Sequence, residues 1–299
     1  QFSISYIFRL LLTLLIRRHA AAPATFTIHT EQQVADIKPN KGDRVIIDLQ
    51  PSLDENALYR IIQRIYPLDV EIAVVPKLYD MLTGAAKIPE LDSNPLVLIT
   101  EHKMTDSELC IKRAFDIVAS LLTMILLSPV YILLWILAYS SSKGPAFYSQ
   151  QRIGLHGKPF NIYKFRTMVQ YAEDDVPQLS ADDDPRVTRV GHFMRKYRLD
   201  ELPQMWNILR GDMSIVGPRP EREFFIRQIV EQAPYYCLLY KIRPGMTSWG
   251  PIRVGYTDTL QKMIDRLNYD IVYMENMSLR LDIKILFYTI GVIVDGKGK

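Results

Sequence analysis

A long uncharged stretch near the middle of the chain constrains its fold more than any other feature. Residues 117–142 are 26 consecutive residues without Asp, Glu, Lys or Arg. A helix needs about 20 mainly apolar residues to cross a bilayer, so this stretch is long enough to enter one. Ser128 and Pro129 lie near its centre. Because proline removes a backbone hydrogen bond and clashes with the preceding turn, we expect the helix to break there.

Two membrane topologies fit this stretch. A straight span would place its ends on opposite faces of a membrane, whereas a helix bent at Pro129 would leave through the leaflet that it entered. Lys112 and Arg113 precede the stretch, and Lys143 follows it. Since basic residues favour the cytoplasmic side, their presence at both ends favours a re-entrant membrane helix over residues 110–143. A buried helix of a soluble protein is disfavoured by the length of the stretch.

The first 20 residues contain a second, shorter apolar stretch, which Arg9 interrupts and Arg17 and Arg18 close. It is too short for a confident span, so we expect residues 1–20 to form a partial membrane segment or an interfacial amphipathic one.

The composition excludes several classes of protein. With 48% hydrophobic and 23% charged residues, the chain can build a core and is not globally disordered. A net charge of +3 gives no reason to expect nucleic acid as a partner. Two cysteines and five scattered histidines argue against a disulfide framework and against a zinc site of His and Cys ligands.

Residues 30–105 alternate strand and helix patterns. Residues 44–49 and 70–75 are typical of strands, and a helix between them begins with a capping box at Ser52 and Glu55. Residues 95–100 predict a third strand. We therefore expect a small βαβ domain with a parallel sheet. No glycine-rich phosphate loop follows the first strand, so a regulatory or packing role is favoured over nucleotide binding.

Residues 144–299 contain an acidic pair, Asp200 and Glu201, just ahead of Pro203. Proline is favoured in the first turn of a helix, which predicts that the pair lies at or near the N-terminus of a helix over residues 202–209. The helix dipole stabilises negative charge there. Such a pair can act as an ordinary helix cap. Alternatively, one carboxylate can act as a nucleophile while the other holds a divalent cation.

Basic side chains in rigid turns accompany this pair. Arg219 lies between two prolines in GPRP, and Arg243 precedes Pro-Gly in RPG. Lys164 and Arg166 belong to the motif KFRTM. Guanidinium groups bind phosphate through a planar fork. Beside an acidic pair, in a chain with a membrane segment, these residues predict an anionic, phosphate-bearing substrate at a membrane.

Several motifs resemble those of the bacterial sugar transferase family, the monotopic phosphoglycosyl transferases. The matching segments are KRAFDIVAS, the Ser128–Pro129 pair, QQRIG, KFRTM, RLDELPQMWNILRGDMSIVGPRP, RPGMT and YDIVYMENMSLRLDIKIL. The resemblance implies an α/β fold: an α+β catalytic core over residues 144–299, a re-entrant helix, and a small Rossmann-like domain ahead of them. It also implies the transfer of a sugar 1-phosphate from a UDP-sugar to undecaprenyl phosphate, with release of UMP.

The same resemblance implies roles for individual residues. Asp200 would be the nucleophile and form an aspartyl phosphosugar intermediate, and Glu201 would be the Mg²⁺ partner. Arg219 and Asp270 match active-site positions of the family. One departure is the loop Trp249–Ile252, which reads Trp-Gly-Pro-Ile where the family commonly has Trp-Ala-Gln-Val. The way in which the family recognises the sugar donor through that loop is therefore not assigned to this chain.

The family also implies a place and partners. The partner is membrane lipid, and the place is the cytoplasmic face of the bacterial inner membrane. The reaction would be the first step of capsule, exopolysaccharide or O-antigen type glycan assembly. A homodimer is possible. Two alternatives remain. One is a non-catalytic membrane-associated scaffold or ligand-binding protein. The other is a nucleotide-sugar hydrolase that uses water as the acceptor. The sequence does not name the sugar.

Overall fold

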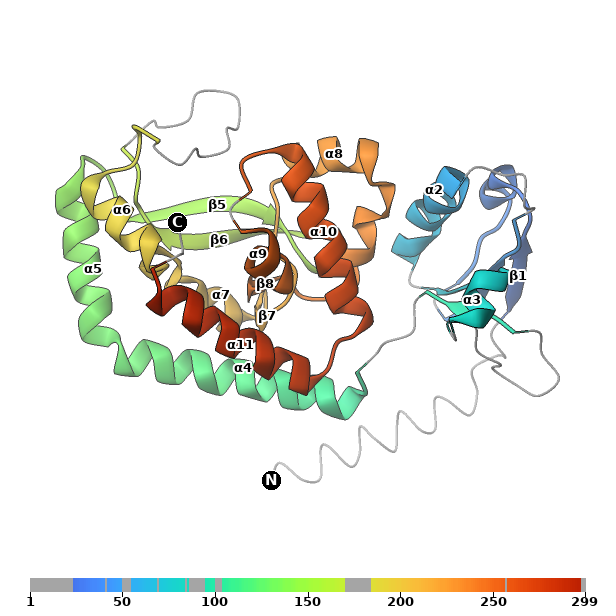
Figure 1. Ribbon diagram of the computed structural model, residues 1–299, viewed down its shortest axis with the longest axis horizontal. Helices are drawn as coiled ribbons and strands as arrows, with labels where there is room; N and C mark the ends of the chain where they lie inside the picture. The colour runs from blue at the N-terminus through green and yellow to red at the C-terminus, as the bar shows by residue number, and fades with distance from the viewer. Residues whose placement is uncertain are drawn as a thin grey trace. The chain divides into compact units, whose positions relative to one another are not determined.

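The chain divides into two compact units, residues 1–101 and residues 102–299 (Figure 1). The computed structural model describes residues 24–40, 42–49, 55–68, 70–83, 85, 95–99, 104–169, 184–255 and 257–296. The apolar segment predicted at residues 1–20 and the helix cap predicted at Ser52 lie outside the described residues.

The first unit contains a four-stranded sheet in the order β1 (Thr25–Ile28), β2 (Arg44–Ile47), β3 (Glu71–Val74) and β4 (Val97–Leu98). The first three strands run parallel, and β4 pairs antiparallel with β3. The shorter elements of this unit are η1 (Glu31–Ala35), α2 (Glu55–Ile65), η2 (Tyr66–Leu68) and α3 (Leu78–Leu82).

The predicted βαβ unit is confirmed for β2, α2 and β3, where Ile61 and Ile65 of α2 are fully buried. One expectation was wrong, because the third strand, β4, pairs antiparallel with β3 rather than parallel. The helix described before it, α3, has five residues. Strand β1 was not predicted, because its four residues give too short an alternation to indicate a strand.

The second unit begins with two helices that meet at a sharp bend. Helix α4 (Asp106–Leu126) starts at the capping residue Thr105, and α5 (Ser128–Ser141) follows after Leu127 at an angle of 68°. Pro129 lies in the first turn of α5, where its missing N–H costs no helical hydrogen bond. The predicted break is confirmed, and it falls immediately before the Ser-Pro pair because the proline starts a new helix.

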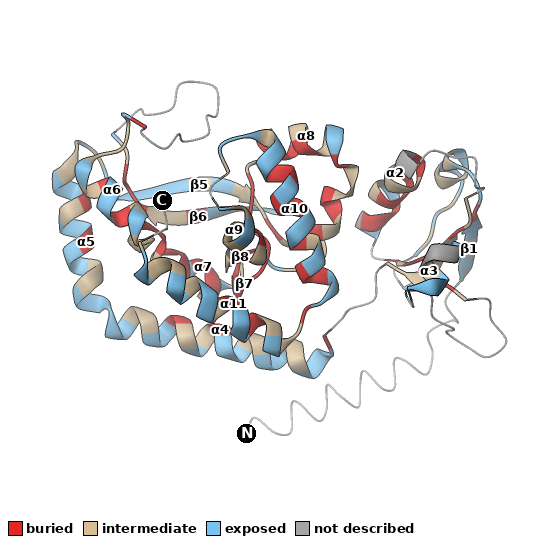
Figure 2. Cartoon of the chain, in the orientation of Figure 1, coloured by how far each residue is buried: buried red, intermediate tan, exposed pale blue. Residues whose placement is uncertain are grey.

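The outer faces of these helices are apolar, and Figure 2 shows that both carry mainly exposed and partly exposed residues. No single helix in the described part of the chain is long and apolar enough to cross a membrane. By length and apolar composition alone, α4 and α5 together could do so as a bent pair. Large apolar side chains that remain exposed include Phe115, Val118, Leu122, Ile125, Leu126, Ile132, Leu133, Trp135, Ile136 and Tyr139.

An antiparallel hairpin follows, formed by β5 (Phe147–Ile153) and β6 (Pro159–Phe165), with η3 (Leu155–Gly157) at its turn. The chain then continues through α6 (Arg189–Lys196), the 3₁₀ turn η4 (Leu199–Glu201) and α7 (Gln204–Arg210). The acidic pair thus lies in η4, about one turn ahead of the first residue of α7. Pro203 caps α7 instead of lying in its first turn.

The rest of the unit contains a two-stranded parallel sheet, formed by β7 (Ser214–Val216) and β8 (Gly245–Thr247). The other elements are α8 (Glu223–Gln232), η5 (Pro234–Lys241), α9 (Trp249–Val254), α10 (Leu260–Glu275) and α11 (Leu279–Val294). Ser278 caps α11 by accepting a hydrogen bond from the N–H of Leu281.

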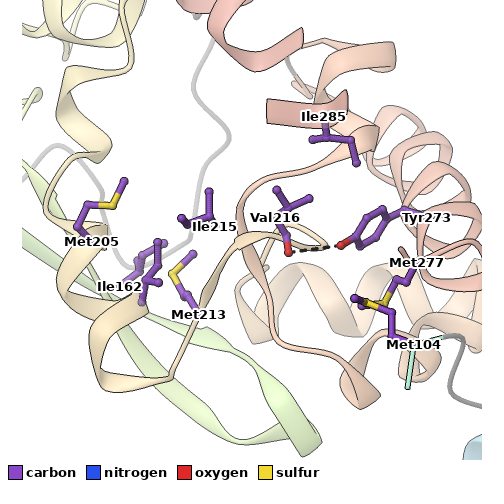
Figure 3. Close-up of a cluster of buried hydrophobic side chains, with 10 residues drawn as sticks. Met104, Ile162, Met205, Met213, Ile215, Val216, Tyr273, Met277 and Ile285 are labelled. Carbon is purple, nitrogen blue, oxygen red and sulfur yellow. Dashed lines mark hydrogen bonds between the residues drawn. The ribbon is translucent and has the colours of Figure 1, made fainter. Parts of the chain in front are cut away.

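The core beneath the sheet joins elements that are distant in the sequence (Figure 3). Met213 and Ile285 are fully buried in it. The Tyr273 hydroxyl donates to the carboxylate of Asp282 at 2.7 Å and approaches the carbonyl oxygen of Val216 at 3.5 Å. This cluster holds α10, α11 and β7 together.

Polar side chains of α4 fasten the bent helix pair to this core. Lys112 donates to the carbonyl oxygen of Val216 at 2.9 Å and pairs with Asp282. Arg113 donates to two carbonyl oxygens at the C-terminal end of α7. Buried Asp116 accepts the N–H of Ile215 at 3.0 Å. The KRAFD motif therefore serves as the attachment of the apolar helices to the rest of the unit.

Candidate active site

The acidic pair is buried although it consists of two carboxylates. Asp200 is 7% exposed and Glu201 is 5% exposed. The turn that carries them is entered through Arg198, whose backbone is left-handed (φ 52°). A non-glycine residue in this region is uncommon and is often found at functional sites. Because neither carboxylate is exposed to bulk water, both need partners in the protein or in a ligand.

Three basic side chains converge on Glu201. The Lys164 ammonium donates to its Oε1 atom at 2.6 Å, and Arg198 Nη1 lies 3.4 Å from its Oε2 atom. Arg219 Nη2 lies 3.6 Å from Oε1. Burial by itself would raise the pKa of Glu201, but these three cations hold it well below the usual range. Glu201 is therefore a fixed negative charge at the centre of a basic cluster.

The pKa of Asp200 moves in the opposite direction. Burial raises it, and the nearby charge of Glu201 adds to the effect, while Lys164 counteracts it. The same burial lowers the pKa of the Lys164 ammonium. Neighbouring carboxyl groups whose pKa values are pushed apart are typical of sites where two acids have different tasks. Asp200 is therefore the more basic carboxylate of the two.

The parallel pairing of β7 and β8 brings the GPRP and RPG motifs together. Gly217 and Gly245 approach so closely that a Cβ atom on Gly245 would lie 2.1 Å from the Gly217 nitrogen. Only glycine fits there. The backbone nitrogen of Arg219 is 3.4 Å from the carboxylate of Asp270, which also accepts a hydrogen bond from the Ser248 hydroxyl. Burial raises the pKa of Asp270 to about 6. Asp270 thus supports the Arg219 backbone.

Two predicted site residues are not brought to the acidic pair. Arg166 is buried and donates through Nη2 to the carbonyl oxygens of Ala138 and Ser142, at the end of α5. The Arg243 Nε atom donates to the carbonyl oxygen of Gly211, beyond the C-terminal end of α7, whereas the acidic pair precedes that helix. The structure brings Lys164, Asp200, Glu201 and Arg219 together, with Asp270 behind Arg219.

Sequence reasoning missed three residues of this site. Arg198 pairs with Glu201, and the charge of Arg195 lowers the pKa of Asp200. Both precede the acidic pair by six residues or fewer, a proximity that could have indicated them. Ser248 donates to Asp270 from a loop 22 residues away, and no sequence pattern pointed to that contact.

The donor set is compatible with Mg²⁺. Within the described ranges, no three His, Cys, Asp or Glu side chains converge as a ready-made metal site. Mg²⁺ is commonly held by one or two carboxylates together with phosphate oxygens of a substrate, so Asp200 and Glu201 suffice on the protein side. Because Lys164 and Arg198 already occupy the oxygens of Glu201, an ion there would share that carboxylate with them.

The fold and the site together define a class of protein. In this class, a bent pair of apolar helices is attached to a core, and the core holds a buried pair of carboxylates among basic side chains. The family model "Bacterial sugar transferase" matches residues 107–296. The chain belongs to this family. The match covers the helix pair, the hairpin and every residue of the site described above.

Curated relatives carry related names. The chain is 36% identical to the UDP-N-acetylgalactosamine-undecaprenyl-phosphate N-acetylgalactosaminephosphotransferase of Aeromonas hydrophila, over 87% of this chain and 62% of that protein. It is 35% identical to the UDP-glucose:undecaprenyl-phosphate glucose-1-phosphate transferase of Escherichia coli K12, over 87% of this chain and 56% of that protein. The undecaprenyl-phosphate galactose phosphotransferase of Salmonella typhimurium is 39% identical over 68% of this chain and 44% of its own length. The chain thus spans roughly half of these relatives.

Proposed function

We propose that this protein transfers a sugar 1-phosphate from a UDP-sugar to undecaprenyl phosphate and releases UMP. The observation that carries the proposal is the buried pair of Asp200 and Glu201, whose environments push their pKa values apart within a basic cluster. Membership of the sugar transferase family and the names of its relatives support the substrate class. Those names differ in the sugar, so the proposal leaves the sugar open.

The chemistry proceeds in two displacements at one phosphorus atom. A carboxylate oxygen of Asp200 attacks the phosphorus that bears the sugar, and the pyrophosphate P–O bond breaks to release UMP. The sugar phosphate is then bound to Asp200 as an acyl phosphate. A phosphate oxygen of undecaprenyl phosphate attacks the same phosphorus, the bond to Asp200 breaks, and the carboxylate is regenerated. Each step exchanges one P–O bond for another.

The basic cluster stabilises this chemistry. Lys164 and Arg219 lie beside the acidic pair and would bind the oxygens on which negative charge accumulates. Glu201, with the donor phosphates, would hold Mg²⁺, which supplies charge neutralisation at the diphosphate. The left-handed turn at Arg198 keeps the Asp200 carboxylate within this cluster.

The bent helix pair supplies the membrane attachment in this proposal. We infer that α4 and α5 enter and leave the cytoplasmic leaflet of the bacterial inner membrane, so that the site meets the phosphate of its lipid acceptor. The bend of 68° and the exposed apolar faces support this topology. Cysteines placed at positions 101 and 158 should both be labelled from the cytoplasmic side, and labelling of one of them only from outside would contradict it.

The covalent intermediate provides the decisive experiment. Incubation of the protein with UDP-sugar and Mg²⁺, without acceptor, should add one sugar phosphate to Asp200, detectable by intact-mass spectrometry, and release one equivalent of UMP. Asp200→Asn keeps the size of the side chain and should abolish both signals. Near-normal transfer by the Asn variant would refute the assignment. Absence of any UMP release would favour a non-catalytic scaffold, and continued release without acceptor would favour a hydrolase.

A further inference from the structure

The turn over residues 217–221, GPRPE, places the Arg219 side chain beside the acidic pair, with its Nη2 atom 3.6 Å from Glu201. Two of its five residues are prolines. Pro218 and Pro220 restrict their own φ angles, but they have no N–H to donate to a neighbouring strand or helix. The position of Arg219 therefore depends on groups outside the turn.

Glu221, the last residue of this turn, provides a link to two such groups. The residue is 4% exposed. Its Oε1 atom accepts a hydrogen bond from Arg266 of α10, and its Oε2 atom lies 3.4 Å from Nη1 of Arg152 in β5. The same Nη1 atom donates to the carbonyl oxygen of Pro220 at 3.2 Å. One buried carboxylate thus joins the turn to a strand and to a helix.

Further contacts hold the two arginines. Arg266 is 4% exposed, and its Nη1 atom donates to the hydroxyl of Thr257 at 2.8 Å. Gly250 of α9 packs so closely against α10 that a Cβ atom at this position would collide with the Arg266 side chain. The Arg152 Nη2 atom donates to the side chain of Gln150 at 2.7 Å. Both arginines are therefore held by residues outside the turn.

This buried cluster is better suited to fixing a geometry than to supplying stability. Removing charges from water costs free energy that offsets much of their mutual attraction, so a buried ion pair is weak evidence for stability. Glu221 is buried and both of its carboxylate oxygens contact arginines, so it is not placed to bind a substrate. The residue nearby that does reach the acidic pair is Arg219.

We propose that Glu221 is a positioning residue, which holds the Arg219 guanidinium beside the acidic pair by linking the GPRPE turn to Arg152 and Arg266. Asp270 assists from the same helix as Arg266, because its carboxylate contacts the backbone nitrogen of Arg219. Arg219, and not Glu221, would bind the phosphate oxygens. The kinetic part of this assignment rests on the proposed function.

A double-mutant cycle on kcat tests the assignment in the full chain in detergent. The substrates are undecaprenyl phosphate and whichever of UDP-glucose, UDP-galactose and UDP-N-acetylgalactosamine the wild type transfers. Glu221→Gln keeps the shape of the side chain but removes the charge that both arginines contact. It should lower kcat about tenfold and change the KM for the UDP-sugar less than about twofold. In the Arg219→Ala background it should lower kcat less than about twofold, because the group that it positions is absent.

Two results of this cycle would overturn the proposal. Equal losses of kcat in both backgrounds would indicate that Glu221 acts without Arg219. A change in the KM for the UDP-sugar with an unchanged kcat would place Glu221 in substrate binding instead.

Glu223→Gln is the matched control. Glu223 lies two residues after Glu221, but its side chain is exposed and pairs with Arg227 of the same helix at 2.6 Å. This variant should leave kcat unchanged in both backgrounds, and a loss equal to that of Glu221→Gln would overturn the proposal. If Glu221→Gln does not fold, Arg152→Lys takes its place. It keeps the charge balance of the cluster, shortens its reach to Pro220, and should give the same pattern with a smaller loss.

Thermal denaturation separates this proposal from the proposed function, because it needs no turnover. The contact between Arg219 and Glu201 requires the turn to be held in place. The Tm losses of Arg219→Ala and Glu201→Gln should therefore be non-additive by about 2–4 °C in an otherwise wild-type chain, and additive in the Glu221→Gln background. Non-additivity that persists without the Glu221 charge would overturn the positioning role. A protein that gives the expected result but transfers no sugar phosphate would support the role of Glu221 and refute the transferase proposal.

Discussion

Replacing Arg166 should destabilise the protein rather than remove a substrate contact. Lys164 and Arg166 are two residues apart in KFRTM, yet they act in different places. Lys164 pairs with Glu201, whereas Arg166 donates to the carbonyl oxygens of Ala138 and Ser142 at 3.0 and 2.6 Å. Those carbonyls belong to the last turn of α5 and the residue after it, where a cation is favoured by the helix dipole.

The magnitude follows from these contacts. A hydrogen bond to a charged group contributes about 1.5–3 kcal/mol, and Arg166→Ala removes two of them from a buried site. The Nε and Nη1 atoms of Arg166 are buried without a partner in the described part of the chain. The cost of burying them offsets part of the stabilisation that the two hydrogen bonds of Arg166 provide. We therefore expect a net loss of about 3 kcal/mol, or a fall in Tm of roughly 6–12 °C for a unit of this size.

Thermal denaturation in detergent, followed by tryptophan fluorescence, measures this loss, and activity is assayed below the lower Tm. Arg166→Ala should keep activity within a few fold per folded molecule. Lys164→Ala should lose activity on the order of 100-fold, with a smaller change in Tm, because Arg198 and Arg219 still neutralise Glu201. An Arg166→Ala protein that melts like the wild type but has lost activity would refute this reasoning and return Arg166 to the substrate site.

Two further predictions concern the residues around Arg219. Arg219→Lys keeps the charge but not the planar fork, so it should slow transfer about 30- to 1,000-fold, and an unchanged rate would exclude the fork. Burial raises the pKa of Asp270 from its ordinary 3.8 to about 6, so its protonation favours the folded state. Its contribution should stabilise the fold by up to about 3 kcal/mol as the pH falls from 6 towards 4, and be lost above pH 6. Comparing the Tm of wild type and Asp270→Asn between pH 4 and 8 measures this difference, and parallel profiles would contradict it.

Local features of the fold could be predicted because neighbouring residues decide them. The break before Ser128 and Pro129 follows from the chemistry of one proline, and the capping of α11 follows from Ser278. The βαβ unit of β2, α2 and β3 follows from hydrophobic periodicity. The direction of β4 could not be derived in this way, because strand pairing depends on how the intervening chain returns to the sheet.

For the site, the sequence by itself determined which groups are available: a carboxylate pair at Asp200 and Glu201, and basic residues in rigid turns. Only the tertiary structure decided which of them meet. Lys164 and Arg219 reach Glu201, while Arg166 turns to the end of α5 and Arg243 to the end of α7. The physical reason is that a side chain's charge and hydrogen-bonding capacity are properties of the residue, whereas burial and contacts across long sequence separations arise only when strands and helices pack.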